Sequence, residues 1–382
     1  MLSFSCGVTI VKVALVHDWL TGLRGGERCL LEFLKIFPQA DILTLIHVKG
    51  RTDLVIDERI KQQSFLGYLP EIESYYRYLL PLFPLAASTL NLNGYDIVIC
   101  LSHAAAKNVI VPEQTLKICY CFTPMRYIWD QAEKYFGRHT KLLQPLLASL
   151  RAWDKRGSLS VDRFIAISKF IKARIRLFYG QDADVIYPPV RTDWIRPIPK
   201  ARMGDAFLYA GALVPYKRPD VVVDTFNKLG LPLIVAGHGP MAAELKERSR
   251  SNVMFTGPVS DAEMAELYRN ARALVFPAIE DFGMIPVEIQ AAGRPVIGFD
   301  RGGIRESVVG VRIGTKEVPQ GATGVFLSSR TDAPAEELRR GVEYFLEHEH
   351  EFLPASCIAQ AAQFAPERFA QQVTGVINRL YA

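Results

Sequence analysis

The fold is decided by one stretch of the sequence, ALVFPAIEDFGMIPVEIQAAGRPVIGF, residues 273–299. An apolar run opens it at 273–278, and a second apolar run closes it at 295–299. Between them lie a loop with a glycine and a short apolar helix pattern. A strand, a helix and a second strand in direct succession indicate a parallel α/β unit.

The same alternation extends over the whole chain. Apolar strand candidates before residue 190 lie at 11–19, 40–46, 95–102, 116–122, 163–168 and 183–189, and later ones at 206–214, 232–237, 253–259, 273–278 and 295–299. Strands that are apolar along their full length are typical of sheets covered on both faces. We therefore predict an α/β protein with two Rossmann-like, doubly wound domains facing across a cleft.

A change of composition at residues 187–199, which hold four prolines, predicts the connection between the domains. The expected division is an N-terminal domain at 1–190 and a C-terminal domain at 191–355. A helical tail at 356–382 is expected to cross back to the N-terminal domain.

Composition is that of a soluble globular protein, with 49% hydrophobic and 22% charged residues among 382. No apolar run is long enough to span a bilayer, and the N-terminus lacks the pattern of a secretory signal. The six cysteines are then expected as reduced thiols in the cytoplasm. A metal site formed by Cys100, His103, Cys119 and Cys121 is an alternative, but no C-x-x-C spacing supports it, and we predict no metal.

Charge is unevenly distributed. Residues 1–190 carry 23 Lys and Arg against 17 Asp and Glu, whereas residues 191–382 have a net charge of −1. A mildly basic first half predicts an anionic surface or an anionic substrate near it. No nucleic-acid motif is present, so no nucleic-acid partner is predicted.

Three strand-to-loop passages in the second half contain small or cationic residues. GALVPYKRP, 211–219, places Lys217 and Arg218 after a strand-end glycine, where a phosphate can bind. VAGHGP, 235–240, lets a ligand approach the backbone closely. In FTGPVSDAEMAELYRNA, 255–271, Ser260 and Glu263 have capping-box spacing, which needs no ligand. Taken alone, the first stretch is better explained as an exposed basic turn.

The stretch EDFGMIPVE, 280–288, has glutamates at both ends. Gly283 and Met284 are predicted near a helix start, where N–H groups and the helix dipole favour an anion such as a pyrophosphate. Glu288, expected on the first helical turn, can accept hydrogen bonds from two ribose hydroxyls, and Glu280 can face a second hydroxylated ring. The pattern therefore predicts a nucleotide-sugar, although Glu288 could instead stabilise the helix N-terminus.

These segments in this order, ending in EDFGMIPVEIQAAGRPVIGFDRGGIRE, resemble the C-terminal half of family 4 (group 1) glycosyltransferases of the GT-B fold. VHDWLTGLRGGER, LSHAAAKNV and YCFTPMRYIWD in the first half resemble bacterial mannosyltransferase-like members. The resemblance implies a retaining, metal-independent enzyme that needs no cofactor. It would move a sugar, mannose being one possibility, from a nucleoside diphosphate sugar to a hydroxyl acceptor in polysaccharide or glycolipid assembly.

The resemblance also implies roles for individual residues. Lys217 would neutralise the donor diphosphate, Glu280 would lie by the transferred sugar, and His103 by its hydroxymethyl group; these three are the expected catalytic residues. The expected donor-binding residues are Gly25, Gly26, Gly211, Lys217, Arg218, Gly237, Val259, Glu280, Phe282, Gly283, Met284, Ile285 and Glu288. Because no carboxylate is an evident nucleophile, our hypothesis is a front-face mechanism.

Two positions depart from the family pattern. Ala212 stands where members usually have an arginine, and Phe122 where they often have a histidine. The alternatives are accordingly a GT-B epimerase or phosphorylase, or a non-catalytic subunit that binds a nucleotide-sugar. A dehydrogenase is disfavoured because no G-x-G-x-x-G follows the first strand.

Other candidates belong to the first half. His17 and Asp18 could border the cleft, whereas Trp19 and Trp129 are expected to pack, with Trp129 also a candidate for the acceptor pocket. The aromatic segment 68–90 is expected to pack on its own domain. The alternative for this segment is peripheral contact with the inner face of the membrane, beside a lipid-linked acceptor.

Overall fold

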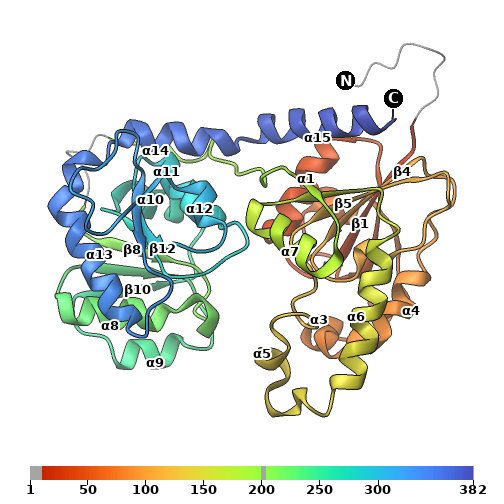
Figure 1. The fold of residues 1–382 in the computed structure, drawn as a ribbon, viewed down its shortest axis with the longest axis horizontal. Coiled ribbons are helices and arrows are strands. Elements are labelled where there is room, and N and C mark those ends of the chain that lie inside the picture. The colour runs from red at the N-terminus through yellow and green to blue at the C-terminus, as the bar shows by residue number, and fades with distance from the viewer. Residues whose placement is uncertain (1–10, 199–203, 382) are drawn as a thin grey trace. The chain divides into compact units, whose positions relative to one another are not determined.

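The computed structural model describes residues 11–198 and 204–381, which form two compact units (Figure 1). The first unit consists of the described residues up to Tyr187 and of the chain from Ala370, and the second is Pro188–Phe369. The division at Tyr187 falls in the proline-rich stretch. The last helix, α15 (Pro366–Tyr381), contains the second division, so its residues belong to both units.

The first unit contains a parallel sheet of seven strands in the order β3-β2-β1-β4-β5-β6-β7. Its strands are β1 (Val13–Leu20), β2 (Asp41–His47), β3 (Ile60–Gln63), β4 (Ile97–Ser102), β5 (Leu116–Cys121), β6 (Arg163–Ala166) and β7 (Ala183–Val185). Its helices are α1 (Gly25–Ile36), α2 (Leu54–Asp57), α3 (Ile72–Tyr75), α4 (Phe83–Ser88), α5 (Ala132–Phe136), α6 (Gln144–Ser158) and α7 (Lys169–Tyr179), with 3-10 turns η1 (Phe65–Tyr68), η2 (Tyr76–Leu82), η3 (Ala106–Asn108) and η4 (Gly137–Thr140).

The burial of its central strands shows that this sheet is covered on both faces. All eight residues of β1 and all six of β4 are buried. Alternate residues face opposite sides of the sheet, so Ala14 and Val16 join a core that also holds Leu80 and Phe83 from η2 and α4. The aromatic segment 68–90 thus contributes to the core of its own unit, as expected, while Tyr68, Tyr78 and Leu85 stay exposed.

The second unit repeats the plan with the strand order β10-β9-β8-β11-β12-β14-β13, again all parallel. Its strands are β8 (Phe207–Ala210), β9 (Leu233–Ala236), β10 (Val253–Gly257), β11 (Leu274–Phe276), β12 (Val296–Phe299), β13 (Gly310–Arg312) and β14 (Gly324–Leu327). Its helical segments are η6 (Pro215–Lys217), α8 (Pro219–Leu229), α9 (Ala242–Glu247), α10 (Asp261–Asn270), α11 (Met284–Ala291), α12 (Ile304–Ser307), α13 (Pro334–His348), η7 (Glu349–Glu351), α14 (Pro354–Ala361) and η8 (Ala362–Phe364).

The helices of the second unit form two packed groups. Helices α8 and α13 pack against each other, while α10, α12 and α14 pack against α11. The chain moves outward from β8 in one direction and from β11 in the other, which puts the crossover helices on opposite faces. The predicted fold of two Rossmann-like doubly wound domains is therefore confirmed. Within the described ranges 11–198 and 204–381, no helix is both long and apolar enough to cross a membrane.

Candidate functional site

The centre of the second sheet is the point where its strand order reverses. Strands β8 and β11 are neighbours, but the chain leaves β8 toward β9 and β11 toward β12, on opposite sides. The loops that follow β8 and β11 therefore diverge. Open α/β sheets bind their ligands at such a point, beyond the carboxyl ends of the strands.

An ion pair joins these two loops. Lys217, at the end of η6 after β8, lies 2.7 Å through its Nζ from Oε1 of Glu280, which follows β11. The two side chains remain 18% and 22% exposed, so both are partly open to solvent. Burial by itself would lower the pKa of Lys217, but the charge of Glu280 and its hydrogen bond raise the pKa above its ordinary value. Lys217 is therefore a cation at neutral pH.

Two glycines let the strand ends approach each other. A Cβ on Gly237 would lie 2.0 Å from the carbonyl oxygen of Gly211, so no larger residue fits there without movement of the backbone. Gly211 lies beneath the lysine, with its Cβ position 3.7 Å from Nζ of Lys217 and 3.9 Å from Cδ1 of Ile285. Four predicted residues, Gly211, Lys217, Glu280 and Ile285, are thus brought together, with Gly237 directly behind them.

A second pair of glycines holds the Glu280 loop, and the sequence prediction missed it. The N–H of Gly303 donates to the carbonyl oxygen of Glu280 at 2.9 Å. Cβ atoms on Gly302 and Gly303 would lie 2.4 Å from that oxygen and 2.2 Å from Cα of Phe282. Gly302 also has a φ of +85°, which glycine adopts without strain. The signal in the sequence was the GG pair after the strand at 295–299.

Helix α11 starts where the sequence predicted. Gly283, with φ +83°, is its N-cap and Met284 its first residue, and no side chain caps that end. Its first N–H groups can therefore serve an anion. The placement of Glu288 on the first turn was wrong, because this residue is the fifth of the helix and opens the second turn.

Glu288 lies in a buried position. Its side chain is 7% exposed, and Tyr268 from α10 donates its hydroxyl to Oε2 at 2.7 Å. Since it is past the first turn, stabilisation of the helix N-terminus explains it less well than a polar contact does. Tyr268 is a partner that the sequence prediction did not identify, although the predicted capping-box helix contains it.

The other predicted donor-binding residues of this unit lie near the same sheet edge. Arg218 opens α8 with a left-handed backbone, and its guanidinium lies 5.1 Å from the ring centroid of Phe299. Phe282 is buried against Phe364, so its backbone is the part that remains for a ligand. Met284 is half-buried, and Val259 lies between β10 and α10.

The first unit has its own reversal point, between β1 and β4. Asp18, near the end of β1, accepts hydrogen bonds from the N–H groups of His103, Ala104, Ala105 and Ala106 at 2.6 to 3.0 Å. Nδ1 of His103 lies 2.9 Å from the same carboxylate. Burial by itself would raise the pKa of Asp18, but His103 and the backbone donors hold it well below its ordinary range.

Asp18 therefore orients His103. A carboxylate accepts, so Nδ1 carries the proton and Nε2 is left for a ligand, on a side chain that is 26% exposed. The edge of the ring contacts Trp19, with centroids 4.3 Å apart, and Trp19 is buried as predicted. Gly25 and Gly26 start α1, and a Cβ on Gly26 would lie 3.2 Å from Nε2 of buried His17. These predicted residues thus surround the end of β1.

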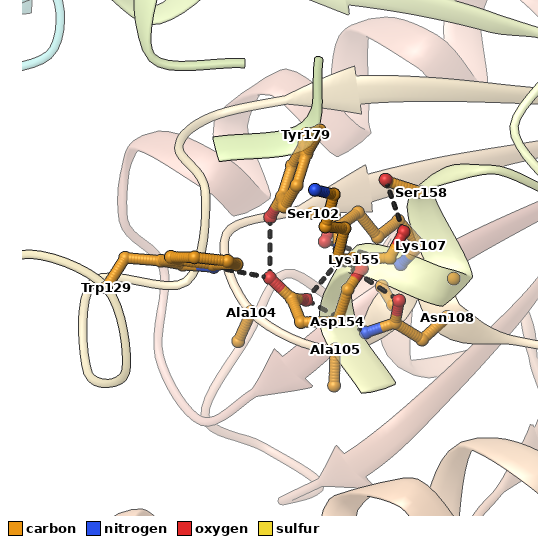
Figure 2. Close-up of polar contacts among 12 residues, drawn as sticks. Ser102, Ala104, Ala105, Lys107, Asn108, Trp129, Asp154, Lys155, Ser158 and Tyr179 are labelled. Atoms are coloured by element: carbon orange, nitrogen blue, oxygen red, sulfur yellow. Dashed lines mark hydrogen bonds and ion pairs between the residues drawn. The ribbon is translucent and has the colours of Figure 1, made fainter. Parts of the chain in front are cut away.

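A buried ionic cluster fastens the far end of the His103 loop (Figure 2). Lys107 pairs with Asp154 of α6, which also accepts from Asn108 at 3.1 Å and from Trp129 and Tyr179 at 2.8 Å. Every donor is directed at one carboxylate, which offsets the cost of burying it. Trp129 therefore serves this cluster, and nothing places it in an acceptor pocket.

The cysteines do not assemble a metal site. Burial raises the pKa of Cys100 to about 12, and Cys119 also has a raised pKa, so both stay protonated thiols. Five cysteines are free and buried, while Cys6 lies outside the described residues. In the part of the chain that the structure describes, no three His, Cys, Asp or Glu side chains are grouped to hold a metal ion.

Parts of the sequence are similar to known proteins. Residues 190–363 match the family model "Glycosyl transferases group 1". O-antigen chain mannosyltransferase C of Escherichia coli is 32% identical over 181 residues, which are 43% of this chain and 47% of that protein. D-inositol 3-phosphate glycosyltransferase of Mycobacterium tuberculosis is 30% identical over 193 residues, 43% of this chain and 40% of that protein. The matched region thus spans less than half of either relative.

Solved structures resemble the chain over nearly its full length. Anabaena HepE in complex with UDP superposes with a TM-score of 0.69 at 15% identity, covering 97% of this chain and 100% of that one. A sucrose-phosphate synthase from Thermosynechococcus elongatus gives 0.69 at 16% identity, covering 97% and 99%. Identities this low establish the fold, which is of the GT-B type.

Proposed function

Because residues 190–363 match the family model of the group 1 glycosyl transferases, we propose that this chain is a retaining glycosyltransferase that takes a sugar from a nucleoside diphosphate sugar. The observation that carries the proposal is the pairing of Lys217 with Glu280 at the reversal point of the second sheet. A lysine that is about one-fifth exposed, beside a helix N-terminus that no side chain caps, suits a diphosphate.

The proposed chemistry uses few protein groups. As the bond from the anomeric carbon to the diphosphate breaks, negative charge grows on the leaving phosphate, and Lys217 and the first N–H groups of α11 stabilise it. Lys217 exchanges Glu280 for the phosphate when the donor binds, before this bond breaks, which frees the carboxylate of Glu280 to accept hydrogen bonds from hydroxyls of the sugar. The departing phosphate oxygen takes the acceptor proton, as a front-face reaction requires, and no metal is needed.

Donor and acceptor are proposed by analogy. HepE was solved with UDP and with UDP-glucose, and the Escherichia coli relative is named for mannose transfer. We propose a uridine or guanosine diphosphate hexose as donor, and a hydroxyl acceptor in polysaccharide or glycolipid assembly. The described cysteines are free thiols, which supports the cytoplasm as the compartment. The exposed Tyr68, Tyr78 and Leu85 support a peripheral membrane contact, which flotation with anionic vesicles would test.

A second candidate, a subunit that binds a nucleotide-sugar without transfer, is favoured by one observation. Ala212 is exposed on the loop after β8 and offers no charge, and Arg218 lies against Phe299. The diphosphate would then meet a single loop cation, Lys217. Release of the nucleoside diphosphate from a donor by the purified chain would eliminate this candidate, together with a pure epimerase.

The test of donor binding is a thermal shift with UDP, GDP, ADP and dTDP. A ligand that binds the folded chain raises its melting temperature. We expect a rise with UDP or GDP in the wild type and in Lys228→Gln, a lysine exposed on α8, and no rise in Lys217→Gln. No rise with any diphosphate in the wild type would contradict the proposal.

A further inference from the structure

The first unit contains a hollow of about 310 Å³ that the donor site does not use. Its lining contains three arginines, Arg24, Arg51 and Arg77, together with Thr21, Ser74 and Glu73. Three guanidinium groups against one carboxylate give the lining a net charge of +2. The hollow therefore offers positive charge and the hydroxyl of Thr21 to a ligand, while the hydroxyl of Ser74 donates to the carbonyl oxygen of Glu71 at 2.9 Å.

The hollow lies at the same sheet edge as His103. Thr21 directly follows β1, and Arg24 is the N-cap of α1. Tyr76, which also lines the hollow, packs on Trp19 with ring centroids 4.9 Å apart, and Trp19 contacts His103 at 4.3 Å. Trp19 and Tyr76 are both buried, so two packed rings separate the hollow from the imidazole that Asp18 orients.

The arginines of the hollow lack acidic partners. Across residues 11–198 and 204–381, no carboxylate forms an ion pair with Arg24, Arg51 or Arg77. Arg77 donates from Nε to the hydroxyl of Tyr76 at 3.3 Å, a neutral acceptor. Arginine stays charged at every accessible pH, so these like charges repel each other until an anion joins them.

A larger hollow in the second unit shows the contrast. Its volume is about 810 Å³, and its lining has five arginines and two acids. Asp300 pairs with Arg305 and Arg312, and Glu337 pairs with Arg340. Most arginines of the larger hollow are therefore already paired with an acid, whereas none of the three arginines of the smaller hollow is paired with one among the described residues.

We propose that this hollow binds a phosphate group carried by the acceptor, so that the acceptor is a phosphorylated hydroxyl compound. Its identity as the acceptor rests on the proposed transferase function, whereas the phosphate site itself does not. The planar fork of arginine matches phosphate oxygens with two parallel hydrogen bonds, and the hydroxyl of Thr21 can donate a further one. At roughly 30 Å³ for a water, the volume holds a phosphate and several waters.

Two sources share this chemistry, a dissolved phosphate ester and a phosphate borne by a lipid. The segment that supplies Ser74, Tyr76 and Arg77 also exposes Tyr78, with 80% of its surface accessible, and Tyr68, with 75%. Both sources carry the same phosphate oxygens to the same arginines, and the test below separates them.

The first experiment measures binding of inorganic phosphate by calorimetry. The variants are the double substitution Arg51→Gln with Arg77→Gln, the donor-site variant Lys217→Gln, and the control Arg176→Gln, an arginine exposed on α7. Charge-assisted hydrogen bonds are worth roughly 1.5–3 kcal/mol, so we expect the double variant to bind about tenfold more weakly or worse. Lys217→Gln and Arg176→Gln should retain this affinity, and equal binding by the double variant and the wild type would overturn the proposal.

The second experiment identifies the source. Glycerol 1-phosphate is titrated in solution, and phosphatidylcholine vesicles with and without phosphatidic acid are tested by flotation. Binding of glycerol 1-phosphate that the double variant loses supports a dissolved acceptor, and flotation that needs phosphatidic acid and both arginines supports a lipid-borne one. Binding of neither overturns the proposal. The thermal shift with UDP and GDP is independent of these arginines, so failure of the donor proposal would be seen separately.

Discussion

Each unit pairs an acid with a nitrogen-bearing side chain at its reversal point, Asp18 with His103 in the first and Glu280 with Lys217 in the second, but the two pairs differ in environment. Asp18 is fully buried and accepts four backbone N–H groups besides contacting His103. Lys217 and Glu280 are about one-fifth exposed and hold each other at 2.7 Å. The same topology thus gives two different sites. In the first unit, protein donors occupy the acceptor positions of the Asp18 carboxylate, and in the second unit the ion pair of Lys217 and Glu280 is open enough for a ligand to replace one partner.

The difference in environment implies different roles: Asp18 positions another side chain, whereas Lys217 and Glu280 can bind a ligand. A carboxylate with all its acceptor positions occupied cannot take a ligand without losing bonds in the fold, so Asp18 acts through His103. Lys217 is about one-fifth exposed, so an anion from solvent can reach it and replace Glu280 as its partner. Substitutions that remove charge should therefore affect stability in the first unit and ligand binding in the second.

The largest expected effect is the loss of stability on Asp18→Asn. The amide keeps the shape but removes the charge, and its NH2 group faces backbone donors, so unfolding of the first unit should become easier by about 4 kcal/mol. Lys217→Gln should cost about 1 kcal/mol or less. Denaturation followed by tryptophan fluorescence measures both, because Trp19 reports on the first unit and Trp194 on the second. Equal losses in the two variants would remove the distinction.

The next effect is on transfer. Lys217→Gln removes the cation that meets the leaving phosphate, and the loss of such a group lowers kcat by roughly 10²–10³-fold. Glu280→Gln keeps the shape of the loop and should lower kcat with little change in the affinity for a free nucleoside diphosphate. The measurement is a steady-state assay with calorimetry for the nucleotide. Wild-type kcat in Lys217→Gln would show that the pair is structural, like Asp18.

The fold was predictable because its central strands are apolar throughout. β1, β4 and β12 are buried along their whole length and stand out from the sequence. Three edge or near-edge strands were missed. β3 has the sequence IKQQ with no apolar run, and β13 has only three residues. β14 has four residues, of which the first is a glycine. Edge strands are short and partly exposed, so hydrophobic periodicity carries little signal for them.

The site was predictable where a residue type alone carries the chemistry. Lys217 and Glu280 were expected in one site from the family resemblance, and they meet because they follow strands that neighbour each other at the reversal point. The roles of Asp18 and Gly303 were not, since their partners lie in other loops and no local pattern marks a backbone acceptor or a close approach. Glu288 was assigned to the first turn although α11 begins where it was predicted, because the fifth residue of a helix with 3.6 residues per turn already lies on the second turn.

A smaller effect tests whether Glu288 resembles Asp18 or Glu280. It is buried like the former but belongs to the second unit, and Tyr268 donates to it at 2.7 Å. Tyr268→Phe removes that donor from a buried carboxylate and should destabilise the second unit by about 1–2 kcal/mol. If Glu288 binds the ribose, the variant should also weaken UDP or GDP binding, whereas Tyr78→Phe, at an exposed tyrosine on η2 of the first unit, should change neither. A loss of stability without a loss of affinity for UDP or GDP would show that Glu288 has a structural role like that of Asp18.

The smallest effect is a pH dependence in the first unit. Burial lowers the pKa of His17, while Glu27 and Asp18 raise it and His103 lowers it further. The folded state therefore keeps His17 neutral at a pH where the unfolded chain already binds a proton. Stability should fall as the pH drops below about 6.5, by no more than about 1.4 kcal/mol per pH unit for one proton.

The variant His17→Asn isolates this contribution. An asparagine amide can keep the hydrogen bond that Nδ1 of His17 makes with the carbonyl oxygen of Trp19 at 3.0 Å, and it does not titrate. The difference in unfolding free energy between wild type and variant should shrink as the pH falls from 7 toward 5, before Asp18 begins to lose its charge. If the difference in unfolding free energy between wild type and variant stays constant over this range, His17 has the same pKa in the folded and unfolded chain. The pH response of the buried group around Asp18 would then come from Asp18 alone.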